Sequence, residues 1–146
     1  MDTKVKIPMK KQILIIAITL MANFSFGQGF QKGNLFGLHM VTINLTPNVT
    51  MDEFKTFFVN KVLPEYEKSW TGLKGYLVKS VRGEYKNSFG IVWLFESEAA
   101  RDKYFNADGS PNELEKAAFE KVKAIEEELK KYGTYTIKYL DDWVVQ

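Results

Sequence analysis

The segment Phe89–Glu96 (FGIVWLFE) predicts a β-strand that is apolar on both of its faces. Alternate side chains of an extended strand point to opposite sides, so Ile91 and Trp93 face one way while Val92 and Leu94 face the other. A strand of this kind is stable when both faces are covered, which places it in the middle of a sheet. The preceding strand from Leu73, joined to it by a turn at 86–88, is more polar and is predicted nearer an edge.

Two further strands and a helix are predicted around this hairpin. The segment Leu35–Leu45 (LFGLHMVTINL) alternates regularly and is also largely apolar on both faces. Thr50 and Glu53 have the spacing of a capping box, which predicts a helix that starts at Met51. Three-and-four spacing predicts one apolar stripe on this helix, to lie on a sheet: Phe54, Phe57, Phe58, Val62, Tyr66 and Trp70. Pro64 lies inside that helical pattern and predicts a kink or break at 60–63.

The chain after the hairpin predicts a short helix, a long helix and a last strand. The short helix runs from Glu98 to Phe105. Ser110 and Glu113, with Pro111 at the first helical position, repeat the capping-box pattern at the start of the long helix. Gly133 ends that helix, and the segment 134–145 (TYTIKYLDDWVV) forms a strand on which Tyr135, Ile137, Tyr139 and Trp143 share a face.

The resulting order β-α-β-β-α-β predicts an α+β, ferredoxin-like domain. A right-handed crossover gives an antiparallel sheet of strand order 4-1-3-2, with the helices on one face. Helices cover just one face of such a sheet, although its central strands are apolar on both. A second copy of the same sheet would cover the other face, so we expect a homodimer.

Three stretches of the chain resemble the dimeric α/β-barrel superfamily. They are the helix FKTFFVNKVLPEY from Phe54, the strand entry GLKGY from Gly72, and WLFESEAARD from Trp93. The superfamily includes antibiotic-biosynthesis-type monooxygenases, EthD-like proteins and NIPSNAP-like proteins. The resemblance implies a homodimer whose two sheets form a barrel. These motifs are structural, and the fold hosts many activities.

The first 27 residues are predicted to be a cleaved secretory signal peptide. Lys10 and Lys11 precede an apolar run of roughly ten residues, Ile13–Ala22, which is too short for a membrane span of about 20. Ser25 and Gly27 are small residues at the expected cleavage site. We therefore expect a periplasmic or secreted protein without stable membrane insertion, in which residues 28–146 form a single domain. Translation could start at Met1 or Met9.

The composition excludes several kinds of site. The chain has no cysteine, which rules out disulfides and thiolate metal ligands, and a single histidine, so a histidine-rich metal site is impossible. The formal net charge is +2, but the predicted signal peptide contributes +3, which leaves the remainder near neutral. A near-neutral domain gives no reason to expect nucleic acid as a partner. We expect no metal and no cofactor.

Six strand residues are candidates for a site beside the sheet. His39 could act as a general base, or be a histidine bonded within the core. Arg82 could clamp an anionic substrate, or pair with Glu84 or Glu96. The candidate ligand-binding residues are aromatic: Tyr76, Trp93, Tyr139 and Trp143. Two functions remain open: the binding of a small apolar or aromatic ligand, or a cofactor-independent monooxygenase or isomerase-like enzyme that uses His39.

Overall fold

The computed structural model describes residues 29–146, so the predicted signal peptide lies outside the described residues. The chain divides into the units Met1–Phe30 and Gln31–Gln146, and the fold below is that of the second unit. Four strands form one antiparallel sheet: β1 (Leu35–Leu45), β2 (Leu73–Lys79), β3 (Phe89–Phe95) and β4 (Gly133–Val144). The prediction of an α+β domain with a four-stranded antiparallel sheet is therefore confirmed.

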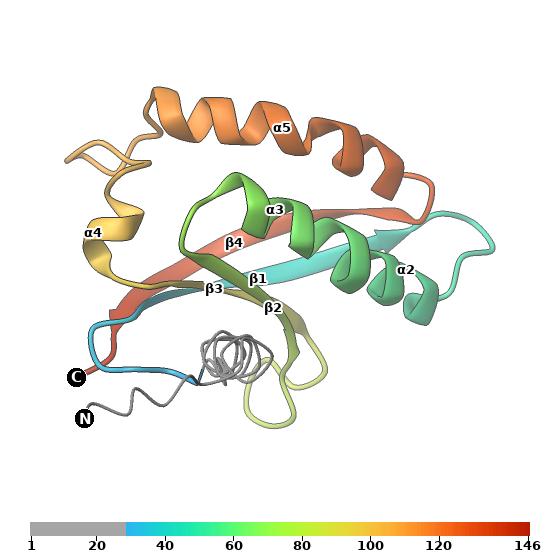
Figure 1. Cartoon of the computed structure of the whole chain (residues 1–146). Helices are drawn as coiled ribbons and strands as arrows, with labels where there is room; N and C mark the ends of the chain where they lie inside the picture. Colours follow the sequence, from blue (N-terminus) through green and yellow to red (C-terminus); the bar gives the residue numbers. More distant parts are fainter. Residues whose placement is uncertain (1–28) are drawn as a thin grey trace, which may run out of the picture. The chain divides into compact units, whose positions relative to one another are not determined.

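The sheet has the strand order β2-β3-β1-β4, which read from the other edge is β4-β1-β3-β2. The two strands that are apolar on both faces, β1 and β3, are neighbours in the middle, and β2 lies at an edge. The loop between β2 and β3 spans residues 80–88 and is longer than the expected turn at 86–88. Helices lie along one face of the sheet (Figure 1).

The first helical run is continuous, with a π-helical turn where a kink or break was predicted. It consists of α2 (Met51–Phe57), a π-helical turn (Phe58–Val62) and α3 (Leu63–Ser69). Thr50 caps α2 with the full capping box predicted from the sequence. Pro64 has no N–H to donate to the carbonyl of Asn60. The wider π-helical turn just before it accommodates the missing bond, so the run continues.

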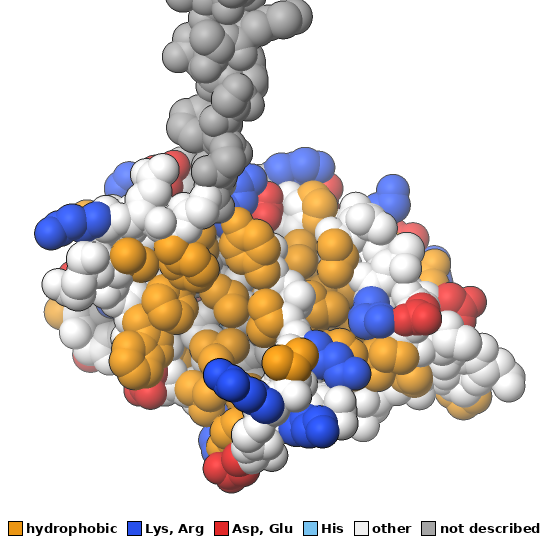
Figure 2. All heavy atoms as spheres, turned by 90° about the horizontal axis from the view of Figure 1, so that it is seen from below, with side chains coloured by type: hydrophobic (Ala, Val, Ile, Leu, Met, Phe, Trp, Pro, Cys, Tyr) orange, Lys and Arg blue, Asp and Glu red, His pale blue; other side chains and the backbone are white. Residues whose placement is uncertain are grey.

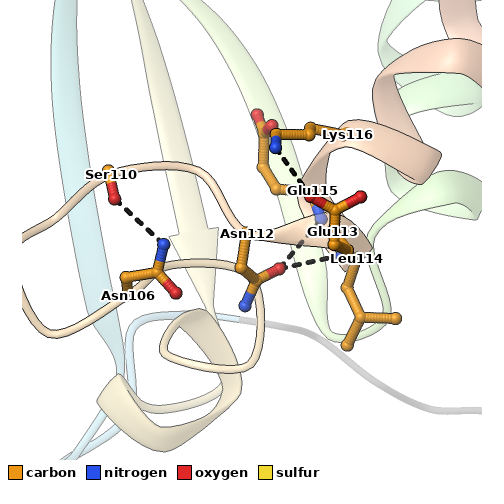
Figure 3. A network of polar contacts seen from close by, with 7 residues as sticks. All are labelled: Asn106, Ser110, Asn112, Glu113, Leu114, Glu115 and Lys116. Atoms are coloured by element: carbon orange, nitrogen blue, oxygen red, sulfur yellow. Dashed lines mark hydrogen bonds and ion pairs between the residues drawn. The ribbon is translucent and has the colours of Figure 1, made fainter.

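The second helical region begins at α4 (Glu98–Arg101), which is shorter than predicted, and continues with α5 (Glu113–Leu129). The cap of α5 is Asn112 and not Ser110: Asn112 Oδ1 accepts hydrogen bonds from the N–H groups of Leu114 and Glu115 (Figure 3). The hydroxyl of Ser110 instead accepts from Asn106 and donates to Asp108. The capping box predicted for Ser110 and Glu113 is therefore wrong: α5 starts later, and the N–H of Asn112 donates to the carbonyl of Tyr104 and not to a glutamate. Within 29–146, no helix is long and apolar enough to cross a membrane.

The core lies between the helices and one face of the sheet. The apolar stripe of the first helical run is buried as predicted, with Phe54, Phe58 and Val62 at most 1% exposed. It packs on residues of the central strands such as Leu35 and Ile91. From α5, the core includes Ala118, Val122 and Leu129.

The opposite face of the sheet, which we call the open face, carries no helix of residues 29–146. Strand alternation places on it Phe36, Leu38, Met40, Val92 and Leu94 from the central strands. The edge strands add Tyr76, Val78 and Trp143, which are 40%, 36% and 55% exposed. Hydrophobic side chains gather across this side of the domain (Figure 2).

Candidate functional site

A cleft of about 910 Å³ lies on the helix-covered side of the sheet. Strands β1, β3 and β4 contribute its floor, and α3 and α5 contribute its walls. Most of its lining is apolar or aromatic, including Leu35, Trp70, Ile91, Trp93, Phe105 and Phe119. Such a lining, with a few polar groups, is typical of a small-molecule site.

His39 lies on β1 at the floor of the cleft, beside Tyr139 of β4. The two rings meet edge to face with their centroids 5.4 Å apart. His39 Nδ1 is buried and has no hydrogen-bond partner among the described residues. Burial lowers the pKa of His39 below its ordinary value of 6.5, and the negative charge of Asp142 partly opposes this effect. His39 is therefore mostly neutral at pH 7 and can accept a proton.

A β-bulge in β4 brings Asp142 into the cleft. The pairing of β1 with β4 shifts between Leu38 and His39, so that Asp142 stands opposite Gly37. One extra residue reverses the alternation of every side chain beyond it. Trp143 is therefore on the open face, and the prediction that it shares a face with Tyr139 is wrong.

Gly37 leaves the space that Asp142 occupies. A Cβ atom on Gly37 would lie 2.6 Å from Asp142 Oδ1 and 3.9 Å from His39 Nε2. A side chain at this position would displace the carboxylate or narrow the cleft above the imidazole. The absence of a side chain at position 37 thus lets Asp142 lie against β1 near His39.

Arg101, at the end of α4, is the arginine of the cleft. Its Nη1 lies 3.6 Å from Asp142 Oδ2, and its Nε lies 2.9 Å from Asp102 Oδ1. The guanidinium is also 6.0 Å from the ring centroid of Phe105. Because Arg101 is flanked by two carboxylates, its charge is already compensated and offers little surplus attraction for an anion.

A second cluster of polar side chains in the cleft connects α3, α5 and β4. Glu126 Oε1 accepts hydrogen bonds from the hydroxyls of Tyr66, at 2.8 Å, and Tyr135, at 3.0 Å. Burial raises the pKa of both tyrosines, and the negative charge of Glu126 raises them further. Both phenols therefore stay protonated and donate to the carboxylate. The ring of Tyr66 stacks on those of Trp70 and Trp93, each with a centroid distance of 5.1 Å.

The structure brings together three of the six predicted site residues: His39, Trp93 and Tyr139 all line the cleft. Arg82 does not join them, because it is exposed in the loop 80–88. Tyr76 and Trp143 are on the open face, so they cannot line a cleft on the helix-covered side. Arg82 and His39 therefore do not lie in one site.

Sequence reasoning missed Arg101, Asp142 and the cluster of Tyr66, Glu126 and Tyr135. Arg101 is the second of two arginines and lies at the end of α4, the short helix that follows the strand with Trp93, which was a usable signal. Tyr66 was placed in an apolar stripe, although a buried phenol needs a hydrogen-bond partner. Its partner Glu126 is 60 residues away, and no local pattern predicts that contact.

Among the described residues, no group of three or more His, Asp or Glu side chains could hold a metal ion. No protein-family model matches the chain, and no curated protein matches it significantly. The fold and the cleft define an α+β domain with an aromatic-lined pocket between its sheet and its helices.

Proposed function

We propose that this protein binds a small apolar or aromatic ligand in the cleft between the sheet and the helices. The observation that carries the proposal is the cleft itself, whose volume of about 910 Å³ is sufficient for a drug-sized molecule. Its aromatic walls supply apolar contact area, and His39, Arg101 and Asp142 supply orienting polar groups. Ligand binding needs only this arrangement of side chains, whereas an enzyme would also need a reaction.

The neutral fluorescent probe N-phenyl-1-naphthylamine tests this function. We expect saturable binding at one site per chain, with a rise in probe fluorescence as it leaves water. Trp93→Phe, which shrinks a wall of the cleft, is expected to weaken binding several-fold. Trp143→Phe is the matched control, because it makes the same change on the open face. Non-saturable binding, or equal effects of the two variants, would contradict a site in the cleft.

The alternative is an enzyme, a cofactor-independent monooxygenase or an isomerase-like protein, in which His39 is the general base. Two observations support the enzyme. The imidazole of His39 is neutral in the cleft, and Asp142 is near enough to stabilise the imidazolium that proton transfer would form. His39→Ala is expected to abolish oxygen uptake or isomerisation with any phenolic or carbonyl substrate that the wild type converts. Unchanged turnover in that variant would exclude the acid–base role.

We further propose that a second copy of the chain covers the open face, as in a dimeric α/β barrel. The central strands place no charged side chain on that face, and the charged residues there are on the edge strands: Lys138 and Asp141 on β4, and Lys74 on β2, which pairs with Glu67 of α3. A charged partner would find no counter-charge in the middle of the patch. A copy related by two-fold symmetry would bring the same apolar residues together.

Light scattering of the purified protein tests the dimer. We expect a mass of two chains, and we expect Leu38→Lys to give a folded monomer because it places a charge in the middle of the patch. Val59→Lys is the matched control, since Val59 is a 43% exposed valine on the helical side. A monomeric wild type would overturn this proposal and leave the ligand-binding function standing.

The proposed location is the periplasm or the medium, after cleavage near Gly27. The basic and then apolar leader supports it. Mass spectrometry of the protein secreted by a bacterial host should show an N-terminus at residue 28. An intact leader on the secreted protein would contradict cleavage at this position.

A further inference from the structure

We propose that the cleft selects aromatic ligands that carry a positive charge, and that Glu126 of α5 is the anchor for that charge. This inference rests on the proposed ligand-binding function and adds the chemical class of the ligand. It also assigns a binding role to a residue whose sequence context, three consecutive glutamates on a charged helix, indicates a solvated surface.

Glu126 is a half-buried carboxylate whose partners are neutral. Both phenol hydrogen bonds go to Oε1, and no hydrogen bond or ion pair within residues 29–146 reaches Oε2. Two lysines line the cleft, Lys123 on α5 and Lys130 at its C-terminal cap, and each has another partner: Lys123 pairs with Glu120 and Lys130 with Glu127, both at 2.5 Å. Within the described part of the chain, no cation is therefore paired with the carboxylate of Glu126.

Electrostatics inside the cleft favours a cation at this point. A carboxylate that is partly removed from water interacts more strongly with an ammonium group than an exposed one does. The two phenols hold Oε1 in place, so Oε2 is oriented before a ligand arrives. The nearby stacked rings of Tyr66, Trp70 and Trp93 provide aromatic faces, which attract cations as well as apolar groups.

An aromatic acid is disfavoured by the same charges. Carboxylates line the cleft from two elements: Asp142 on β4, and Glu115, Glu126 and Glu127 on α5. The cations of the cleft lining are all paired: Arg101 is flanked by Asp102 and Asp142, and both lysines are paired with glutamates, as described above. A ligand carboxylate would therefore meet uncompensated negative charge at Glu126 and a neutralised arginine near His39.

Three matched probes test the charge preference on the full chain. They are 2-naphthylmethylamine, 2-naphthylmethanol and 2-naphthylacetate, which share one ring system and are cationic, neutral and anionic at pH 7. Isothermal titration calorimetry is expected to rank them in that order, with at least a ten-fold difference in Kd between the amine and the acid. Raising the salt concentration should weaken the binding of the amine and leave the affinity for the alcohol unchanged.

The variant Glu126→Gln locates the anchor, because glutamine keeps the size and can still accept the phenol hydrogen bonds. We expect the affinity for the amine to fall about ten-fold, to that of the alcohol, while the alcohol binds as before. Glu128→Gln is the matched control, because it neutralises an exposed glutamate outside the cleft lining. It should change neither the affinity for the amine nor the affinity for the alcohol. Alcohol binding measured on each variant also verifies that it is folded.

The outcomes separate this inference from the function on which it rests. Equal or tighter binding of the acid, or an amine affinity that Glu126→Gln does not change, overturns the charge preference while cleft binding stands. If neither these three probes nor N-phenyl-1-naphthylamine binds, both proposals fail.

Discussion

The two faces of the sheet are built from the same two central strands, and helices of residues 29–146 lie on one of them (Figure 1). On the helix-covered face, the side chains of β1 and β3 meet helices of the same chain, and the cover leaves a cleft with charged and hydrogen-bonding groups. On the open face, the alternate residues of the same strands form an apolar patch with charges at its edges. Apolar side chains on one face of a strand thus predict that this face is buried. They do not predict which element buries it, because that depends on the rest of the chain.

Truncation of adjacent residues of β3 gives the largest expected contrast between the faces. Ile91 is 1% exposed in the core, so Ile91→Ala should lower the free energy of unfolding by about 2–5 kcal/mol. Val92 points to the open face, so Val92→Ala should cost less than about 1 kcal/mol in the isolated subunit, where it removes two methyl groups from a partly exposed site. Urea denaturation followed by circular dichroism measures both.

Protein concentration distinguishes the two variants further. The effect of Ile91→Ala should be the same at every concentration, because its contacts are within one chain. A cost for Val92→Ala that grows with protein concentration would indicate that the open face is covered by a second copy. Equal, concentration-independent losses for the two variants would contradict the difference between the faces.

A glycine on each face gives a second, smaller contrast. A Cβ on Gly75, which faces the cleft side, would lie 2.6 Å from Trp93 Cζ3 and 2.9 Å from Leu63 Cδ2. Gly75→Ala should therefore cost about 1–3 kcal/mol by overpacking, displace the indole and weaken N-phenyl-1-naphthylamine binding. Thermal unfolding and probe titration measure the two effects.

The control is Gly90→Ala on the open face, where the nearest atoms to an added Cβ would be 3.2 Å away. It is expected to cost less and to leave the affinity for the probe unchanged. Equal loss of probe affinity in both glycine variants would show that the position of Trp93 does not determine binding.

Local patterns in the sequence were sufficient for the elements of the fold. Two-sided alternation predicted β1 and β3, and three-and-four spacing predicted the buried stripe of Phe54, Phe58 and Val62. These patterns work because burial of one helix stripe or one strand face is a property of consecutive residues. Capping was less well predicted: Ser110 and Asn112 are both good caps, and tertiary contacts of the loop decided between them.

Local patterns also predicted part of the candidate site. His39, Trp93 and Tyr139 followed from strand alternation. Asp142 did not, because a β-bulge inserts one residue and reverses the alternation of the last part of β4, and the sequence shows no glycine there to mark it. Glu126 reads as one of three exposed glutamates, and its role depends on phenols that are distant in sequence.

The smallest expected effect is a shift in the titration of His39, and it tests whether Asp142 acts on the cleft. His39 is the single histidine of the chain, so its imidazole resonances in an NMR titration need no assignment. Its pKa should lie below 6.5, and Asp142→Asn should lower it further by removing the charge that favours the imidazolium. Asp141→Asn is the control, because Asp141 stands opposite Leu38 and faces away from the cleft.

The same shift fixes the sign of a pH effect on stability. Between the folded pKa of His39 and 6.5, the unfolded chain binds more protons than the folded one, so stability falls as the pH is lowered through this window. Above 6.5, His39 contributes no slope. His39→Gln should remove this part of the pH dependence, and Asp142→Asn should extend the window to lower pH. A His39 pKa above 6.5 would reverse the slope and would mean that Asp142 outweighs burial, leaving a cationic imidazole in the cleft.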